Sequence, residues 1–94
     1  MDLHINPFRA DCTDKEAALK PLEEASEARE AWSMMDEYTR KFPSQNGAYV
    51  CTRLADELAD CITACCNLAD RYGIDLQAAL DRVEKHNRER GRYE

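Results

Sequence analysis

Residues 58–69 read LADCITACCNLA, and Asp60 is the only charged residue among them. A helix that is apolar on nearly all sides is normally buried. A helix is expected from about residue 49 to residue 72, and it contains this whole segment. Gly73 can close that helix in a left-handed conformation. The segment therefore predicts the core of an all-α fold.

The residues before this segment predict two helices. Thr13 and Glu16 form a capping-box pattern that can open a helix over residues 13–20. Pro21 interrupts that helix and is expected to begin a new or kinked helix over residues 21–41, because proline is tolerated at the first helical position. The apolar positions of the second helix recur mostly three or four residues apart: Leu22, Ala25, Trp32, Met35 and Tyr38.

The remaining segments complete a single domain over residues 1–94. Residues 1–12 are expected to be irregular, and residues 42–47 to form a break between helices. Asp75 can cap a last helix over residues 75–90. The apolar face of this fourth helix comprises Leu76, Ala79, Leu80 and Val83.

Composition narrows the classes of function. The chain has 19 acidic and 13 basic residues, a formal net charge of −6, which disfavours nucleic-acid binding and leaves a DNA-binding helix-turn-helix a distant third hypothesis. No uncharged stretch approaches the roughly 20 residues of a membrane span, and no secretory signal is recognisable. Five cysteines are most simply read as reduced thiols of a cytoplasmic protein. A chain of 94 residues has a thin core, so a partner subunit would help it fold.

Pairs of acidic residues three positions apart can present two carboxylates on one helix face. Their spacing alone is uninformative, because chance supplies about four such pairs at this acidic content. Their neighbours are more informative. The five pairs are Asp11/Asp14, Glu24/Glu27, Glu27/Glu30, Glu57/Asp60 and Asp81/Glu84.

In two of these pairs, one member lacks a compensating cation one helical turn away. Asp60 has no basic residue three or four positions away, and Glu27 has none either. A buried carboxylate needs a partner, and a divalent metal would supply one. Oxygen ligands favour Mg²⁺ or Mn²⁺ over zinc. The alternative, a solvated acidic face, stays open, more so for Glu24/Glu27 than for Glu57/Asp60.

Four motifs follow one another in an order that resembles the MazG-like, all-α nucleoside triphosphate pyrophosphohydrolases. Residues 22–27 read LEEASE and fit EExxE, and residues 56–60 read DELAD and supply ExxD. Residues 67–76 then read NLADRYGIDL, and residues 84–91 read EKHNRERG. The resemblance covers residues 17–91.

This resemblance implies a hydrolase of phage or bacterial type that cuts an NTP or dNTP between its α- and β-phosphates, giving NMP and pyrophosphate. It implies a four-helix bundle completed by oligomerisation, as a homodimer or homotetramer. A metal-bound water would attack the α-phosphorus, and Glu23 would help to orient water or support the metal ligands. The metal ligands carry over as Glu24, Glu27, Glu57 and Asp60. The substrate contacts carry over as Lys85, Asn87 and Arg88.

Each of these assignments has a plainer alternative. Lys85 and Arg88 can instead complement the dipole of a helix C-terminus. Trp32 can stack on a nucleobase, although a lone tryptophan at helical spacing is more often a core residue. Cys61, Cys65 and Cys66 are expected to be small buried core residues.

The second hypothesis for the whole chain is a non-catalytic helical module that binds a nucleotide or a protein. Its motivation is the small size of the chain and the 29 residues that separate Glu27 from Glu57. Stabilisation by Mg²⁺ or Mn²⁺ would distinguish the metal-dependent enzyme from this module.

Overall fold

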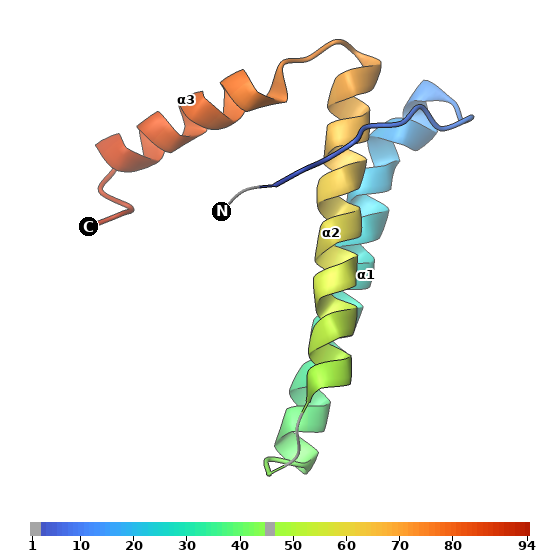
Figure 1. Ribbon diagram of the computed structural model, residues 1–94, viewed down its shortest axis with the longest axis vertical. Helices are drawn as coiled ribbons and strands as arrows, with labels where there is room; N and C mark the ends of the chain where they lie inside the picture. The colour runs from blue at the N-terminus through green and yellow to red at the C-terminus, as the bar shows by residue number, and fades with distance from the viewer. Residues whose placement is uncertain (1–2, 45–46) are drawn as a thin grey trace.

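In the described part of the chain, the regular structure consists of three α-helices, α1 (Asp14–Lys41), α2 (Ala48–Arg71) and α3 (Leu76–Glu89). The computed structural model describes residues 3–44 and 47–94, and no β-strand occurs among them. The all-α prediction is confirmed. α1 and α2 form a long antiparallel hairpin, and α3 projects away from one end of it (Figure 1). Gln45 and Asn46, in the expected break, lie outside the described residues.

The expected division at Pro21 is wrong, because residues 13–20 and 21–41 belong to one helix. Pro21 lies inside α1, which runs for 28 residues. A proline removes one backbone hydrogen bond and can bend a helix without ending it. The helix continues because good helix formers and the contact with α2 follow this position. The described chain therefore has three helices where four were expected.

The local start and stop signals are confirmed. The Glu16 backbone N–H donates to Thr13 Oγ1 at 3.1 Å, and the Thr13 hydroxyl donates to Glu16 Oε1 at 3.0 Å, which completes the capping box. Asp75 Oδ1 accepts the Ala78 N–H at 3.0 Å and caps α3. Gly73 has φ of 64° and follows the end of α2. The α2 ends thus match their prediction to one residue (residues 48–71 against 49–72).

Small side chains form the contact between α1 and α2. The sequence places several large apolar side chains on one face of residues 21–41. Some of them do not pack against α2, and Leu22 is 69% exposed. The expectation for this face is wrong there, because alanines let the two helices approach closely and leave larger side chains outside the contact. Among the described residues the buried set is Glu24, Ala28, Ala31, Ala64 and Ala69.

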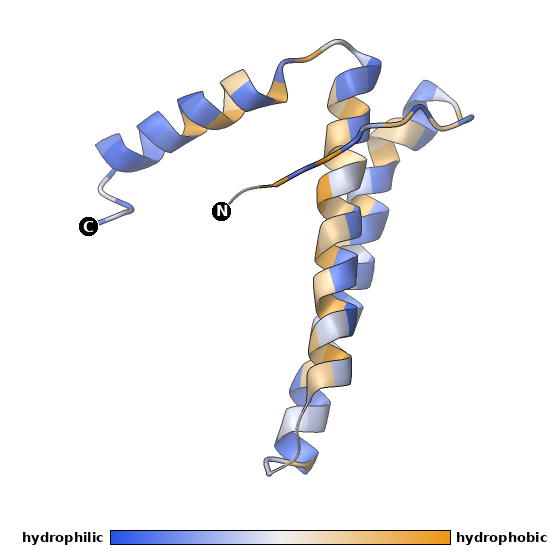
Figure 2. Ribbon diagram, viewed as in Figure 1, coloured by the Kyte–Doolittle hydropathy of each residue, from blue (hydrophilic) through white to orange (hydrophobic). Residues whose placement is uncertain are grey.

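The apolar segment of α2 is also less buried than predicted. Leu58 and Ile62 are exposed, and Cys65, one turn further on, is exposed as well. These three residues share one side of α2, here called the uncovered stripe. Figure 2 shows hydrophobic residues along a side of α2 that α1 does not cover. Within one chain, the prediction of a buried helix over residues 58–69 therefore fails.

α3 adds little to the packing of a single chain. Among the described helices, only α1 and α2 contact each other along their length. Leu80 and Val83, expected on the apolar face of the last helix, are more than half exposed. In the described part of the chain, no helix is long and apolar enough to cross a membrane.

Candidate metal centre

Three carboxylates from two helices converge midway along the hairpin. Glu24 of α1 faces Glu57 and Asp60 of α2, and one oxygen from each lies within 4.8 Å of the others. The ExxD spacing puts Glu57 and Asp60 on one side of α2. The antiparallel hairpin then brings the EExxE segment of α1 against them. The geometry matches three of the four predicted ligands.

Two oxygens of this cluster have no partner in the described structure. Glu24 Oε2 and Glu57 Oε2 are both buried and accept no hydrogen bond. Glu24 is only 8% exposed. A buried carboxylate oxygen without a donor is costly, so each of these atoms calls for a cation or a proton.

Among the described residues, Lys20 is the basic side chain that forms ion pairs with this group. Its Nζ lies 3.2 Å from Glu24 Oε1 and 3.6 Å from Glu23 Oε2. The hydrogen bond to Glu24 and the charge of that carboxylate raise the pKa of Lys20 above its ordinary value. One ammonium group balances only part of the charge of the three clustered carboxylates.

Glu27 adjoins the cluster without belonging to its closest triad. The charge of Glu24, followed by a hydrogen bond with Glu24, raises the pKa of Glu27, and Glu57 adds to the shift. Like charges this close disfavour the ionised form of a carboxyl. The structure therefore places Glu27 beside the other three predicted ligands, in a position where a cation would lower its pKa again.

The burial of the two acid pairs is the reverse of what the sequence predicts. The sequence favoured Glu57/Asp60 because Asp60 was expected to be buried, but Asp60 is exposed. Glu24 is the buried member, and Glu57 is half-buried. The reason is that Asp60 lies at the edge of the α1/α2 contact, whereas Glu24 lies between the helices. Glu23 points to Lys20 at the surface and is not part of the triad.

The predicted substrate residues lie elsewhere in the chain. Lys85, Asn87 and Arg88 belong to α3, which does not pack along α1 or α2. Arg88 donates to Glu84 Oε1 at 2.8 Å and stacks over the Tyr93 ring. The Asn87 side chain accepts a hydrogen bond from Arg90. One chain does not bring these residues to the carboxylates.

Trp32 and the cysteines depart from their expected burial. Trp32 is 48% exposed and is therefore not a core residue within one chain. Cys65 is exposed, and Cys61 and Cys66 are half-buried. Partial burial, followed by the neighbouring Cys61, raises the pKa of the Cys65 thiol, which favours an unreactive side chain. Both departures arise because the surfaces that carry these residues are not covered by another helix.

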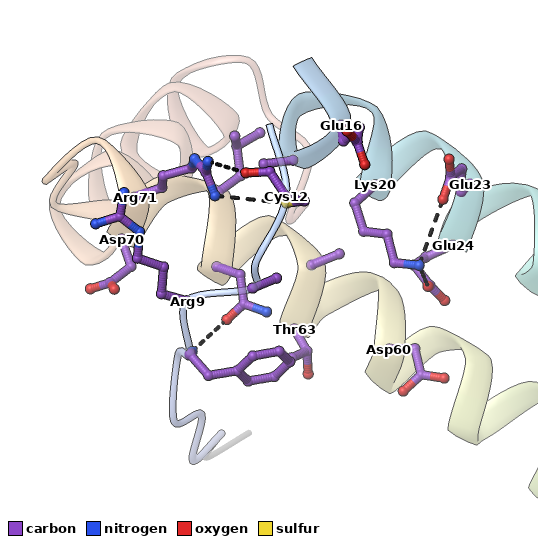
Figure 3. Close-up of a pocket in the computed structure, with 16 residues that line it drawn as sticks. Arg9, Cys12, Glu16, Lys20, Glu23, Glu24, Asp60, Thr63, Asp70 and Arg71 are labelled. Atoms are coloured by element: carbon purple, nitrogen blue, oxygen red, sulfur yellow. Dashed lines mark hydrogen bonds and ion pairs between the residues drawn. The ribbon is translucent and has the colours of Figure 1, made fainter. Parts of the chain in front are cut away.

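Residues that sequence reasoning missed lie in the N-terminal segment (residues 3–13). This segment passes over α2 near Arg71 and lines a cavity whose other end is formed by Glu24 and Asp60 (Figure 3). Its Phe8 N–H donates to Asn67 Oδ1 at 2.8 Å, and Arg71 Nη2 donates to Cys12 O at 2.7 Å. Both hydrogen bonds join residues that are 59 positions apart in the sequence, so no local sequence pattern predicts them.

Comparisons of the chain with protein-family models, with curated proteins and with solved structures found no match.

Proposed function

We propose that this chain is a metal-dependent nucleoside triphosphate pyrophosphohydrolase, which converts an NTP or dNTP to NMP and pyrophosphate. The observation that carries the proposal is the triad of Glu24, Glu57 and Asp60, with two buried oxygens that have no partner. The order of the motifs that resemble MazG-like enzymes supplies the substrate class.

The donor set fits a hard divalent cation. All three groups are carboxylates, and Mg²⁺ and Mn²⁺ prefer oxygen ligands and retain several waters. No cysteine or histidine belongs to the set found among residues 3–44 and 47–94, which disfavours zinc. Glu24 and Glu57 can each turn a free oxygen to the cation, and Glu27 can add a fourth carboxylate.

The surrounding side chains have complementary tasks. The cation, when bound, neutralises phosphate charge and lowers the pKa of a bound water. Lys20 keeps Glu24 in place and can bind a phosphate oxygen next to the carboxylates. Glu23, more exposed and 3.6 Å from Lys20, holds that ammonium from the outer side.

We also propose that the working form is a homo-oligomer. The chain exposes 7711 Å², whereas a compact monomer of its mass exposes about 5,500 Å². Its radius of gyration is 16.4 Å, against about 12 Å for a compact domain of this length. The excess area matches what a stable interface between two subunits buries. The uncovered stripe on α2 supplies an apolar surface for a second copy, which would complete a helical bundle.

The experiment is a pyrophosphate-release assay on the purified protein with Mg²⁺ or Mn²⁺ and a panel of NTPs and dNTPs. We expect release from at least one nucleotide, and loss of release in Glu24→Gln and Asp60→Asn. Asp81→Asn is the matched control, because Asp81 and Glu84 have the same spacing on α3 but lie outside the triad.

Metal binding is measured separately from catalysis by thermal unfolding. A cation at 100 times its dissociation constant stabilises the fold by about 2.7 kcal/mol. Stabilisation without pyrophosphate release would identify a non-catalytic metal-binding module. Absence of both would refute the metal centre itself.

A further inference from the structure

A cavity of about 590 Å³ lies between the N-terminal segment and the α1/α2 hairpin. Its size falls within the range of small-molecule sites. Glu24 and Asp60 contribute to its wall, so the cavity opens directly onto the candidate metal centre (Figure 3). None of the residues expected from the sequence to contact substrate lines it.

The N-terminal wall of the cavity is held by long-range hydrogen bonds. Phe8 is tied through its N–H to Asn67, and Cys12 through its carbonyl to Arg71. The Arg71 side chain is 11% exposed, and its Nε also donates to Asp14 Oδ1 at 2.9 Å. The segment is thereby fixed at both ends of its passage over α2.

The two ends of the cavity differ in character. Figure 3 shows Glu24 and Asp60 at one end, next to Lys20, and Arg9 and Arg71 at the other. Asp60 and Arg71 are 11 positions apart on α2, which corresponds to about 16 Å along the helix axis. A ligand that contacts both ends must therefore be elongated.

The charges of the lining favour a divalent cation in the cavity. Five acidic and three basic side chains line the cavity, so one divalent cation balances them. Arg71 is already engaged by Cys12 and Asp14. Arg9 makes no ion pair or hydrogen bond with any described residue and remains available to a ligand.

Near the arginine end the cavity offers groups suited to a nucleoside. Phe8 is 60% exposed at the lining and presents an aromatic surface. Thr63 and Asn67 line the opposite wall on α2. Asn67 uses its Oδ1 for Phe8, while its amide NH₂ donates to no residue that the structure describes.

We propose that this cavity is the nucleotide-binding site. The phosphate chain lies toward Lys20 and the carboxylates, and the nucleoside lies between Phe8 and α2 near Thr63 and Asn67. The inference rests on the proposed function for the identity of the ligand. It differs from the sequence-based assignment, which placed the substrate contacts on α3.

The test is calorimetric titration of the full chain with non-hydrolysable α,β-methylene analogues of NTPs and dNTPs in Mg²⁺. We expect Phe8→Ala and Arg9→Ala each to weaken binding at least tenfold, because base stacking and a contact of the guanidinium with the nucleoside are lost. Phe8→Leu keeps the apolar bulk and should still weaken binding. Mn²⁺ binding, titrated without nucleotide, should be unchanged in all three variants.

Matched controls are Phe42→Ala and Arg92→Ala, an aromatic and a basic residue outside the cavity. If the wild type binds and hydrolyses nucleotide but the Phe8 and Arg9 variants bind as well as the controls, the cavity assignment is wrong and the proposed function stands. If the wild type binds Mn²⁺ but no analogue, the proposed function fails and the cavity assignment fails with it. If the variants lose Mn²⁺ binding, the N-terminal segment supports the metal centre instead, and the inference is overturned.

Discussion

Lys20 Nζ lies 3.2 Å from Glu24 Oε1 and so places a protein cation against a carboxylate triad that could hold a metal. Lys20 precedes Glu24 by four residues, so α1 itself sets this arrangement. In the absence of metal the ammonium reduces repulsion among the carboxylates. When a divalent cation binds, the same ammonium competes with it for Glu24.

The first prediction concerns Lys20→Met, which keeps the apolar stem of the side chain and removes its charge. We expect the metal-free variant to melt at a lower temperature than the wild type and to bind Mn²⁺ about two- to fivefold more tightly, in line with the strength of partly exposed ion pairs. Isothermal titration with Mn²⁺ measures this. Lys41→Met is the control, because Lys41 pairs with Glu37 at 2.8 Å outside the triad. Weaker Mn²⁺ binding in Lys20→Met would contradict this role.

The second prediction concerns the pH dependence of Glu27. Its pKa is raised above the ordinary value of 4.5, chiefly by the charge of Glu24. The contribution of this carboxyl to the free energy of unfolding is therefore fully present below pH 4.5 and is lost as the pH rises through the raised pKa. In EDTA, Glu27→Gln should accordingly be more stable than the wild type at neutral pH and similar to it below pH 4.5.

Glu37 provides a control of opposite sign. A hydrogen bond with Lys41, followed by the charge of that ammonium, lowers the pKa of Glu37 below its ordinary value. Its stabilising contribution is present above that ordinary value and is lost as the pH falls through the lowered pKa. Glu37→Gln should thus be less stable than the wild type at neutral pH. Thermal melts of both variants across pH 3–8 would refute the interpretation if the two differences had the same sign.

The third prediction concerns Gly73, which has φ of 64° at the end of α2. The Ile74 N–H donates to Ala69 O at 2.9 Å, and the Gly73 N–H donates to Asp70 O at 3.1 Å, so the turn is a Schellman motif. An added Cβ meets no atom within 4 Å, which leaves backbone strain as the cost. Gly73→Ala should lower the free energy of unfolding by about 1–2 kcal/mol. Urea denaturation measures it, and a smaller loss is expected for Gly47→Ala, because Gly47 has φ of −84°.

The features that sequence reasoning predicted are mainly local ones. Thr13, Gly73 and Asp75 act within a few residues of themselves, so their caps could be recognised from spacing. Asp60 of α2 was recognisable because it lacks a basic neighbour one turn away. The cavity was not recognisable, since the contact of Phe8 with Asn67 depends on how a chain segment without periodicity crosses a distant helix. Residues 58–69 are less buried than the sequence predicts. The spacing of apolar residues indicates which helix face is apolar, but it does not indicate whether another helix covers that face.

The fourth prediction concerns Ala31, which is 1% exposed between α1 and α2. A larger side chain would force the two helices apart and distort the approach of Glu24 to Glu57. Ala31→Leu should cost about 1–3 kcal/mol of stability, as overpacking usually does. It should also weaken Mn²⁺ binding. Ala25→Leu on the exposed side of the same helix is the control and should change neither quantity appreciably.

The last prediction concerns Ile62 in the middle of the uncovered stripe. Leu58, Ile62 and Cys65 are spaced four and three residues apart, so one helix of a second copy could lie along all of them. A charge placed there would have to be desolvated on association, whereas in a monomer it would remain in water. Ile62→Glu should therefore shift the protein toward monomer in sedimentation-velocity experiments. Its melting temperature should fall to a value that no longer depends on concentration.

Thr52→Glu is the matched control for this change, because Thr52 is an exposed residue of α2 outside the uncovered stripe. It adds the same charge to the same helix and should leave the oligomer intact. Ile62 does not line the cavity, and its substitution leaves the triad residues in place. A wild-type protein that sediments as a monomer at micromolar concentration would contradict the oligomer. A variant that stays associated would show that a second copy binds through another surface, such as the exposed apolar side of α3.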